Sequence, residues 1–116
     1  MDIELWLSQF KRYWTNHEVE KVLELFDTDV AYFETPFQKL NSYDELNKAW
    51  GAIVNQKDIN LEYSVYSAQD AKFSVIWKLS YKSGDDIMNF SGTYLIELNI
   101  QNKCTYFFHC CEEANR

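Results

Sequence analysis

The sequence predicts an α+β domain in which three N-terminal helices pack on the concave face of a cone-shaped, strongly curved and mostly antiparallel sheet. Two observations lead to this prediction. The first half of the chain repeats apolar residues at helical spacing around one short strand, whereas the remainder alternates with a period of two. Short turns join the alternating segments, which suits successive hairpins without crossover helices.

Composition limits both the number of domains and the kinds of partner. The 116 residues, 47% of them hydrophobic, supply one core but not two, so residues 1–116 are predicted to form a single domain. A formal net charge of −7 opposes binding to nucleic acid. No apolar run approaches the roughly 20 residues that span a bilayer, and acidic Asp2 and Glu4 stand where a signal peptide is basic. We expect a cytoplasmic protein without nucleic-acid or membrane partners.

Two amphipathic helices are predicted at the start of the chain. Residues 3–14 place their apolar side chains at intervals of three and four. Thr15 or Asn16 can cap a second helix, with Glu18 as the capping-box partner of Thr15. The apolar stripe of that short helix is Val19, Val22, Leu23 and Phe26.

A strand and a third helix follow. In residues 29–37, Tyr32 and Glu34 share one face of a predicted strand, which Pro36 ends or confines to a sheet edge. Ser42 and Glu45 form a second capping-box signature. The helix that they start has Leu46, Ala49, Trp50 and Ile53 on its apolar face.

Four long strands are predicted after residue 58, with turns at residues 68–71, 83–86 and 99–102. Gly92 is placed for a bend or bulge in the third of them. The last strand, residues 103–111, is apolar on both faces, which indicates either a central position or coverage by a second subunit. The apolar faces of the other three are Ile59, Leu61, Tyr63 and Val65; Phe73, Val75, Trp77, Leu79 and Tyr81; and Met88, Phe90, Tyr94, Ile96 and Leu98.

The three cysteines, Cys104, Cys110 and Cys111, lie in one short segment, and their odd number does not suit a disulfide framework. His109 is adjacent, but successive strand residues point to opposite faces, so these side chains do not converge on a metal. We therefore predict buried structural thiols and no metal site.

This order of elements resembles the nuclear transport factor 2-like superfamily, and within it the SnoaL-like branch, which includes polyketide cyclases and is similar to ketosteroid isomerase. The resemblance spans nearly the whole chain and is carried by "FKRYW", "VLELFDTDVAYFETPF", "SYDELNKAW" and "FSGTYLIELNIQNKCTYFFHCC". It implies a pocket between the helices and the concave sheet, and pairing of two chains through the outer face of the sheet. We therefore expect a homodimer.

The resemblance also implies positions for catalytic groups. The carboxylate base of isomerase-like members falls on Glu34 when the sequences are read from Phe26, and on Thr35 when they are aligned on Pro36. In the first helix, the position of an oxyanion-binding tyrosine falls on Phe10 or the nearby Tyr13. The corresponding position in the late strand falls on Tyr94.

The residues themselves suggest roles and structural alternatives. Glu34 is a candidate proton acceptor in an aromatic pocket, or else a solvated carboxylate or an ion-pair partner of Lys39. His109 is a candidate second proton-transfer group, or else a histidine that hydrogen-bonds within the core. The aromatic side chains are candidate ligand contacts or simply core: Phe10, Tyr13, Tyr32, Trp50, Tyr63 and Trp77.

The sequence thus predicts a protein that binds a hydrophobic, carbonyl-containing small molecule. As an enzyme it would catalyse isomerisation, cyclisation or dehydration without a cofactor, with Glu34 as proton acceptor, His109 as a second proton-transfer group, and Tyr32 or Tyr94 donating to the enolate oxygen. The alternative is a non-catalytic ligand-binding or protein-association domain.

Overall fold

A single mixed sheet organises the chain in the computed structural model, which describes residues 1–114. Its strands lie in the order β2, β1, β6, β5, β4, β3, and every neighbouring pair is antiparallel except β1 and β6. The strands are β1 (Phe26–Thr35), β2 (Gln38–Leu40), β3 (Lys57–Gln69), β4 (Lys72–Ser83), β5 (Asp86–Leu98) and β6 (Cys104–Glu113). The helices are α1 (Ile3–Thr15), α2 (Val19–Glu24), α3 (Tyr43–Gly51) and the short 3₁₀-helix η1 (Ala52–Asn55).

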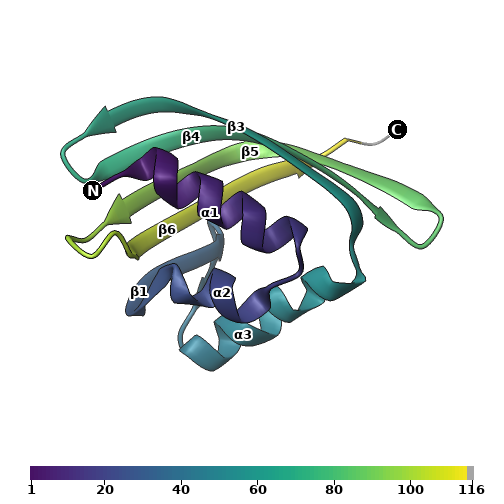
Figure 1. Cartoon of the computed structure of the whole chain (residues 1–116), viewed down its shortest axis with the longest axis horizontal. Coiled ribbons are helices and arrows are strands. Elements are labelled where there is room, and N and C mark those ends of the chain that lie inside the picture. Colours follow the sequence, from purple (N-terminus) through teal and green to yellow (C-terminus); the bar gives the residue numbers. More distant parts are fainter. Residues whose placement is uncertain (115–116) are drawn as a thin grey trace.

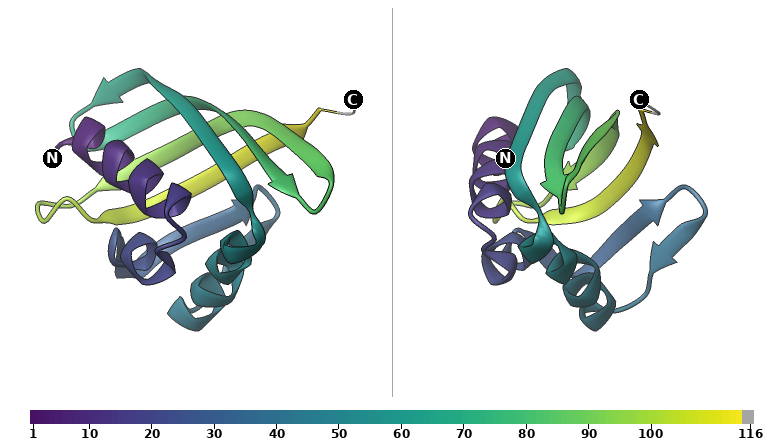
Figure 2. Two further views of the ribbon diagram at one scale, coloured as in Figure 1. Left: turned by 45° about the vertical axis from the view of Figure 1, so that its right-hand side comes forward. Right: turned by 90° about the vertical axis from the view of Figure 1, so that its right-hand side faces the viewer.

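The long strands β3 to β6 arch over the three helices (Figure 1). Seen along the sheet, β3 curls toward α1 on one side while β1 and β2 diverge on the other, and α2 and α3 close the lower end (Figure 2). The predicted α+β class and curved sheet are confirmed. No helix among residues 1–114 is long and apolar enough to cross a membrane.

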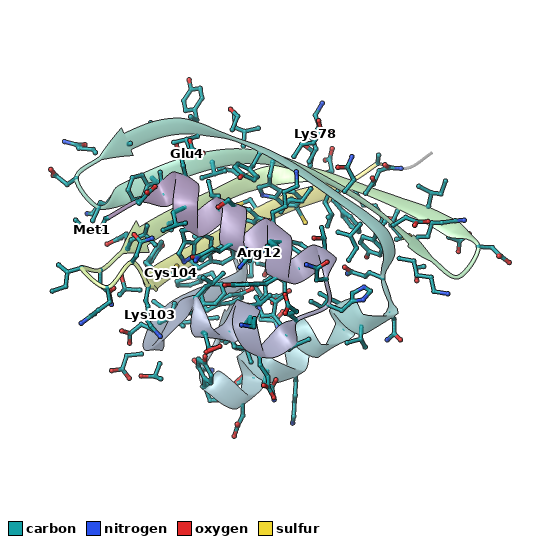
Figure 3. All side chains as sticks on the ribbon, viewed as in Figure 1. Met1, Glu4, Arg12, Lys78, Lys103 and Cys104 are labelled. Atoms are coloured by element: carbon teal, nitrogen blue, oxygen red, sulfur yellow. The ribbon has the colours of Figure 1, made fainter. Side chains whose placement is uncertain are left out.

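Aromatic side chains fill the space between the two layers (Figure 3). Trp6 and Phe10 stack with ring centroids 4.9 Å apart, and Phe26 meets Trp6 edge-on at 5.6 Å. The indole N–H of Trp6 donates to the backbone oxygen of Leu25 at 3.0 Å. This contact satisfies a buried polar group and fastens α1 to the segment that leads into β1.

The helix boundaries agree with one predicted feature, the cap of α3, and differ in two others. Ser42 accepts a hydrogen bond from the N–H of Glu45 at 3.2 Å and caps α3 as predicted. Thr15, however, belongs to α1, where its hydroxyl donates to the backbone oxygen of Lys11 at 2.9 Å. A hydroxyl engaged with the preceding turn does not cap the next helix. The predicted capping box is therefore wrong, and Phe26 starts β1 instead of ending α2.

The strands follow the predicted alternation, with local differences. β1 begins at Phe26, earlier than predicted, and ends at Thr35 just before Pro36; the short β2 lies where a loop was expected. β6 occupies the central position, between β1 and β5. The pairing irregularity of β5 with β6 falls between Glu97 and Leu98 and not at Gly92.

Candidate functional site

A cavity of about 290 Å³ lies between the concave face of the sheet and helices α1 and α3. Strands β1, β4, β5 and β6 and the 3₁₀-helix η1 also contribute side chains to its walls. These walls are mainly aromatic and aliphatic, and none of the lysines and arginines in the described part of the chain lines the cavity. An apolar cavity with a few polar groups is the usual form of a small-molecule site.

The sheet side of the cavity is a continuous aromatic surface. Trp77 stacks on Tyr94 with centroids 5.0 Å apart and on His109 at 5.4 Å, and Tyr32 stacks on Phe107 at 5.0 Å. In register, Gly92 lies between Trp77 on β4 and Cys111 on β6. Because this glycine has no side chain, nothing separates the indole of Trp77 from the side chains of β6.

Glu34 lines the cavity from β1, on the same strand face as Tyr32. Its Oε2 atom is buried and has no hydrogen-bond partner among the described residues. Thr35, by contrast, is exposed, and its hydroxyl accepts the N–H of Phe37 at 3.2 Å. Lys39 places its ammonium over the ring of Phe33, 6.0 Å from the centroid, on the other face of the strand. Of the two positions left open by the resemblance, the cavity contains Glu34.

His109 is held by the strand that carries Glu34. Its Nδ1 atom lies 2.8 Å from the backbone oxygen of Glu34. A carbonyl oxygen only accepts hydrogen bonds, so Nδ1 carries the proton in this contact. In the neutral tautomer with the proton on Nδ1, Nε2 would be a hydrogen-bond acceptor, and His109 lines the cavity.

Tyr32 and Tyr94 are 4% and 2% exposed and also line the cavity. Burial raises the pKa of both phenols well above the ordinary value, and the nearby charge of Glu34 raises the pKa of Tyr32 further. The indole N–H of Trp50 lies near Tyr32 and opposes part of that rise in pKa, although the contact does not have the geometry of a hydrogen bond. Both phenols consequently remain protonated hydrogen-bond donors at neutral pH.

The structure brings most, but not all, of the predicted site residues together. The cavity is lined by Glu34, His109, Tyr94, Phe10, Tyr32, Trp50 and Trp77.

Tyr13 and Tyr63 do not line it, which corrects their predicted placement. Tyr13 lies between the guanidinium of Arg12, 5.0 Å from its ring centroid, and the ammonium of Lys21 at 5.6 Å. Tyr63 lies on the edge strand β3, where burial and then the charge of Glu4 raise its pKa.

Sequence reasoning missed two polar groups of the cavity. Gln56, just after η1, accepts the indole N–H of Trp14 through Oε1 at 2.8 Å; no local pattern marks this long-range contact. Cys111 was assigned with the buried structural thiols, yet it is exposed and lines the cavity, whereas Cys104 is fully buried. Residues two apart on a strand point to the same face, so the inward position of His109 was the signal that Cys111 also points inward.

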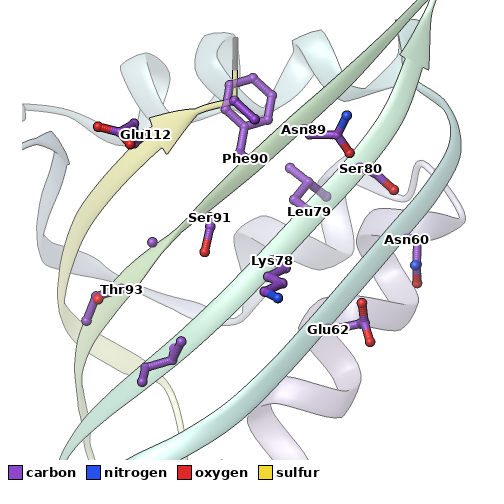
Figure 4. A pocket seen from close by; sticks show the side chains of 13 residues that line it. Asn60, Glu62, Lys78, Leu79, Ser80, Asn89, Phe90, Ser91, Thr93 and Glu112 are labelled. Atoms are coloured by element: carbon purple, nitrogen blue, oxygen red, sulfur yellow. The ribbon is translucent and has the colours of Figure 1, made fainter. Parts of the chain in front are cut away.

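A wider depression of about 650 Å³ lies on the opposite face of the sheet (Figure 4). Its lining is mainly polar side chains of β3, β4 and β5, among them Glu62, Lys78 and Ser91, and most of these are exposed. Lys78 projects from the sheet away from the helices (Figure 3). Within residues 1–114, all three side-chain oxygen and nitrogen atoms that are buried without a partner belong to residues of the inner cavity, so we take the inner cavity as the candidate site.

No group of three or more histidine, cysteine, aspartate or glutamate side chains within residues 1–114 is arranged to hold a metal ion. The polar groups of the cavity are instead one carboxylate, one imidazole, one thiol, one amide, phenols and indoles. Such a set can accept a proton and donate hydrogen bonds to an oxygen that gains charge.

Comparison with solved structures identifies the fold. An NTF2-like protein of unknown function from Exiguobacterium sp. 255-15 superposes with a TM-score of 0.72 and 17% identity, over 96% of this chain and 99% of its own. The epoxide hydrolase/cyclase-like enzyme SalBIII, which has a role in pyran ring formation in the polyether salinomycin, superposes with a TM-score of 0.79 and 9% identity, over 97% of this chain and 90% of its own. A putative scytalone dehydratase from Novosphingobium aromaticivorans DSM 12444 superposes with a TM-score of 0.79 and 11% identity, over 98% of this chain and 86% of its own.

The sequence matches no protein-family model, and no curated protein matches it significantly. At these identities, structural likeness identifies the fold and leaves the activity open. The chain has the nuclear transport factor 2-like fold, as its sequence predicted, and similar structures include enzymes with cyclase, dehydratase and epoxide hydrolase names.

Proposed function

We propose that this protein binds a small uncharged carbonyl compound in the inner cavity and moves a proton on the carbon next to the carbonyl, with Glu34 as the proton acceptor. The observation that carries the proposal is the buried Oε2 atom of Glu34, which lacks a partner in an aromatic cavity. A desolvated carboxylate close to a substrate carbon is the arrangement that general-base catalysis requires.

The reaction uses only groups of the chain itself. Glu34 takes the proton from carbon, the electron pair of the C–H bond forms a C=C bond, the π pair of the carbonyl moves onto its oxygen, and Tyr32 or Tyr94 donates a hydrogen bond to the resulting enolate. Return of the proton to another carbon of a conjugated enolate completes an isomerisation. Departure of a β-hydroxyl group, which takes up the proton and leaves as water, completes a dehydration. We assign the relay of the proton to Nε2 of His109, because this residue lines the cavity and its Nδ1 atom is held by the backbone of Glu34. SalBIII and the putative scytalone dehydratase lend support, because enzymes with cyclase and dehydratase names share this fold.

Exchange of hydrogen for deuterium tests this step without knowledge of the natural substrate. The protein should accelerate exchange at the carbon next to the carbonyl of 1-tetralone in D₂O, followed by NMR. Glu34→Gln should slow the catalysed exchange by about 100-fold or more, the usual contribution of a general base. Glu112→Gln, an exposed glutamate on β6, is the matched control and should leave the rate unchanged. Exchange that is equally fast with Glu34→Gln, or absent with the unaltered protein, would favour a non-catalytic protein.

The second candidate function is association, and the outer face of the sheet favours it. Here Ile76 and Leu95 are 45% and 41% exposed beside three partly exposed aromatic residues. We call this set the outer-face cluster: Phe33, Ile76, Leu95, Tyr106 and Phe108. Its apolar character supports pairing of two chains through this face, whether or not the inner cavity is catalytic.

We further propose a cytoplasmic location. The support is the state of the three cysteines, all of which lie within residues 1–114 and none of which is in a disulfide. Free thiols suit a reducing compartment.

A further inference from the structure

The four tryptophans differ in what their indole N–H groups bind. Trp6 donates to the backbone oxygen of Leu25 at 3.0 Å, and Trp14 donates to Oε1 of Gln56 at 2.8 Å. The N–H groups of Trp50 and Trp77 are buried and have no acceptor among the described residues. A buried donor without a partner destabilises a fold, so two of them in one small protein need an explanation.

Both unpaired indoles line the inner cavity, and they do so from opposite layers. Trp50 comes from α3 and is 7% exposed, whereas Trp77 comes from β4 and is 2% exposed. The carboxylate oxygen of Glu34 is the third buried atom without a partner, and it lines the same cavity. Trp6 does not line the cavity, and Trp14, which does, already has an internal partner. The two indoles without partners face the space that a ligand would fill.

We infer that the N–H groups of Trp50 and Trp77 select the ligand by donating hydrogen bonds to two oxygen atoms of an uncharged ring compound. The inference rests on the proposed function for the identity of the site, and it adds the groups that recognise the ligand there.

The charge and size of the cavity define this class of ligand. No lysine or arginine of residues 1–114 lines the cavity, so among these residues a carboxylate or phosphate group would face Glu34 without a counter-charge. The stacked rings of Trp77, Tyr94 and His109 offer a flat aromatic surface, which favours a flat ligand. At roughly 30 Å³ for each water-sized group, a cavity of about 290 Å³ holds about ten such groups.

The two donors lie in different parts of the cavity. The N–H of Trp50 is close to the phenol of Tyr32, on the strand that carries Glu34. One ligand oxygen can therefore accept from both Trp50 and Tyr32 beside the proton acceptor. Trp77 lies in the stack with Tyr94 and His109 and offers a second position. A ligand with oxygen atoms on two sides of a ring satisfies both indoles at once.

Two probes of nearly equal size test the inference. Tetralin is a bicyclic hydrocarbon without an acceptor, and 4-chromanone carries a carbonyl and an ether oxygen on opposite sides of the same ring system. The affinities of the full chain for both are measured by ligand-observed NMR titration, for the unaltered protein and for Trp50→Phe, Trp77→Phe and Trp6→Phe. The ratio of the two affinities is the result of interest, because the smaller phenylalanine ring affects the binding of both probes through size.

The unaltered protein should prefer 4-chromanone over tetralin, and Trp50→Phe and Trp77→Phe should each reduce that preference by about three- to tenfold, the effect of one lost hydrogen bond. Trp6→Phe, whose indole donates within the fold and does not line the cavity, should keep the preference. In the unaltered protein, the indole N–H signals of Trp50 and Trp77, assigned from the variants, should shift more with 4-chromanone than with tetralin.

Equal affinity for the two probes, binding of neither, or an equal loss of preference in Trp6→Phe would overturn the inference. Deuterium exchange with the unaltered protein, measured beside the affinities, separates this result from the fate of the proposed reaction. If the protein catalyses deuterium exchange but does not prefer 4-chromanone over tetralin, only the inference about the indole donors is refuted. If it prefers 4-chromanone but does not catalyse exchange, only the proposed proton transfer is refuted.

Discussion

Three buried weak acids, Tyr32, Tyr94 and Cys104, determine how the fold responds to alkali. Burial raises the pKa of each group well above its ordinary value of 10.0 for tyrosine and 9.0 for cysteine. In the unfolded chain these groups lose their protons near the ordinary values, while in the folded chain they keep them. The unfolded state therefore binds fewer protons above about pH 9, and the free energy of unfolding falls as pH rises.

We expect urea unfolding to show that these groups leave stability unchanged between pH 7 and about 8.5 and lower it steeply above pH 10. Each group contributes at most about 1.4 kcal/mol per pH unit to the slope. Tyr94→Phe should flatten the slope by up to that amount. Tyr66→Phe is the control, because this ring is 76% exposed and should not affect the slope. An identical slope with Tyr94→Phe would contradict the assignment.

Individual residues of the site were predictable where strand alternation determined their direction. Glu34, Tyr94 and His109 line the cavity because alternation along each strand points these side chains toward the concave face of the sheet. Alternation does not say which inward residues meet a cavity and which meet a helix, so Tyr63 was placed in the site incorrectly. The contact of Gln56 with Trp14 depends on how η1 packs against α1, which no local pattern contains.

The closeness of β5 and β6 depends on Gly92. A Cβ atom at this position would lie 1.9 Å from the backbone oxygen of Cys110 and 2.8 Å from the Cα atom of Cys111. Backbone atoms cannot move aside as a flexible side chain can, so an added methyl group would force the two strands apart. The sequence predicted a bend or bulge at this glycine, whereas the pairing irregularity lies elsewhere and the structure shows close approach of two strands at Gly92.

Gly92→Ala should consequently lower the free energy of unfolding by about 3 kcal/mol or more. The matched control is Gly51→Ala at the end of α3, where an added Cβ meets no atom within 4 Å. That change should raise stability by about 0.5–1 kcal/mol, since alanine restricts the unfolded chain and favours a helix. Urea unfolding of both variants gives the comparison, and similar stabilities for the two would contradict the proposed close approach.

Elements with strong local signals were predicted well, and those that depend on distant partners were not. The capping of α3 by Ser42 was readable because both partners lie within one turn. The parallel pairing of β1 with β6 was not, because it joins segments separated by more than 70 residues, such as Tyr32 with Phe107. The short β2 exists only as the antiparallel partner of β1, through pairs such as Tyr32 with Leu40.

At the scale of the whole molecule, the sheet presents two different apolar surfaces. Its inner face is covered by the helices and encloses the cavity, whereas the outer-face cluster is open in the single chain. Phe33 and Phe108 lie 5.3 Å apart on neighbouring strands, and Leu95 pairs in register with Phe108. Side chains from three adjacent strands thus form a continuous apolar area, which in many proteins marks an interface.

We expect this area to hold two copies of the chain together, so that sedimentation at micromolar concentration gives about twice the 13.9 kDa of one chain. Leu95→Lys should shift the protein to the monomer, because it would place two charges in the interface. Leu5→Lys is the matched control: Leu5 is 47% exposed, against 41% for Leu95, but it lies on α1, on the helical side of the molecule. It should leave the dimer intact. A monomeric unaltered protein would refute the interface and leave the inner cavity as the site at which to seek the function.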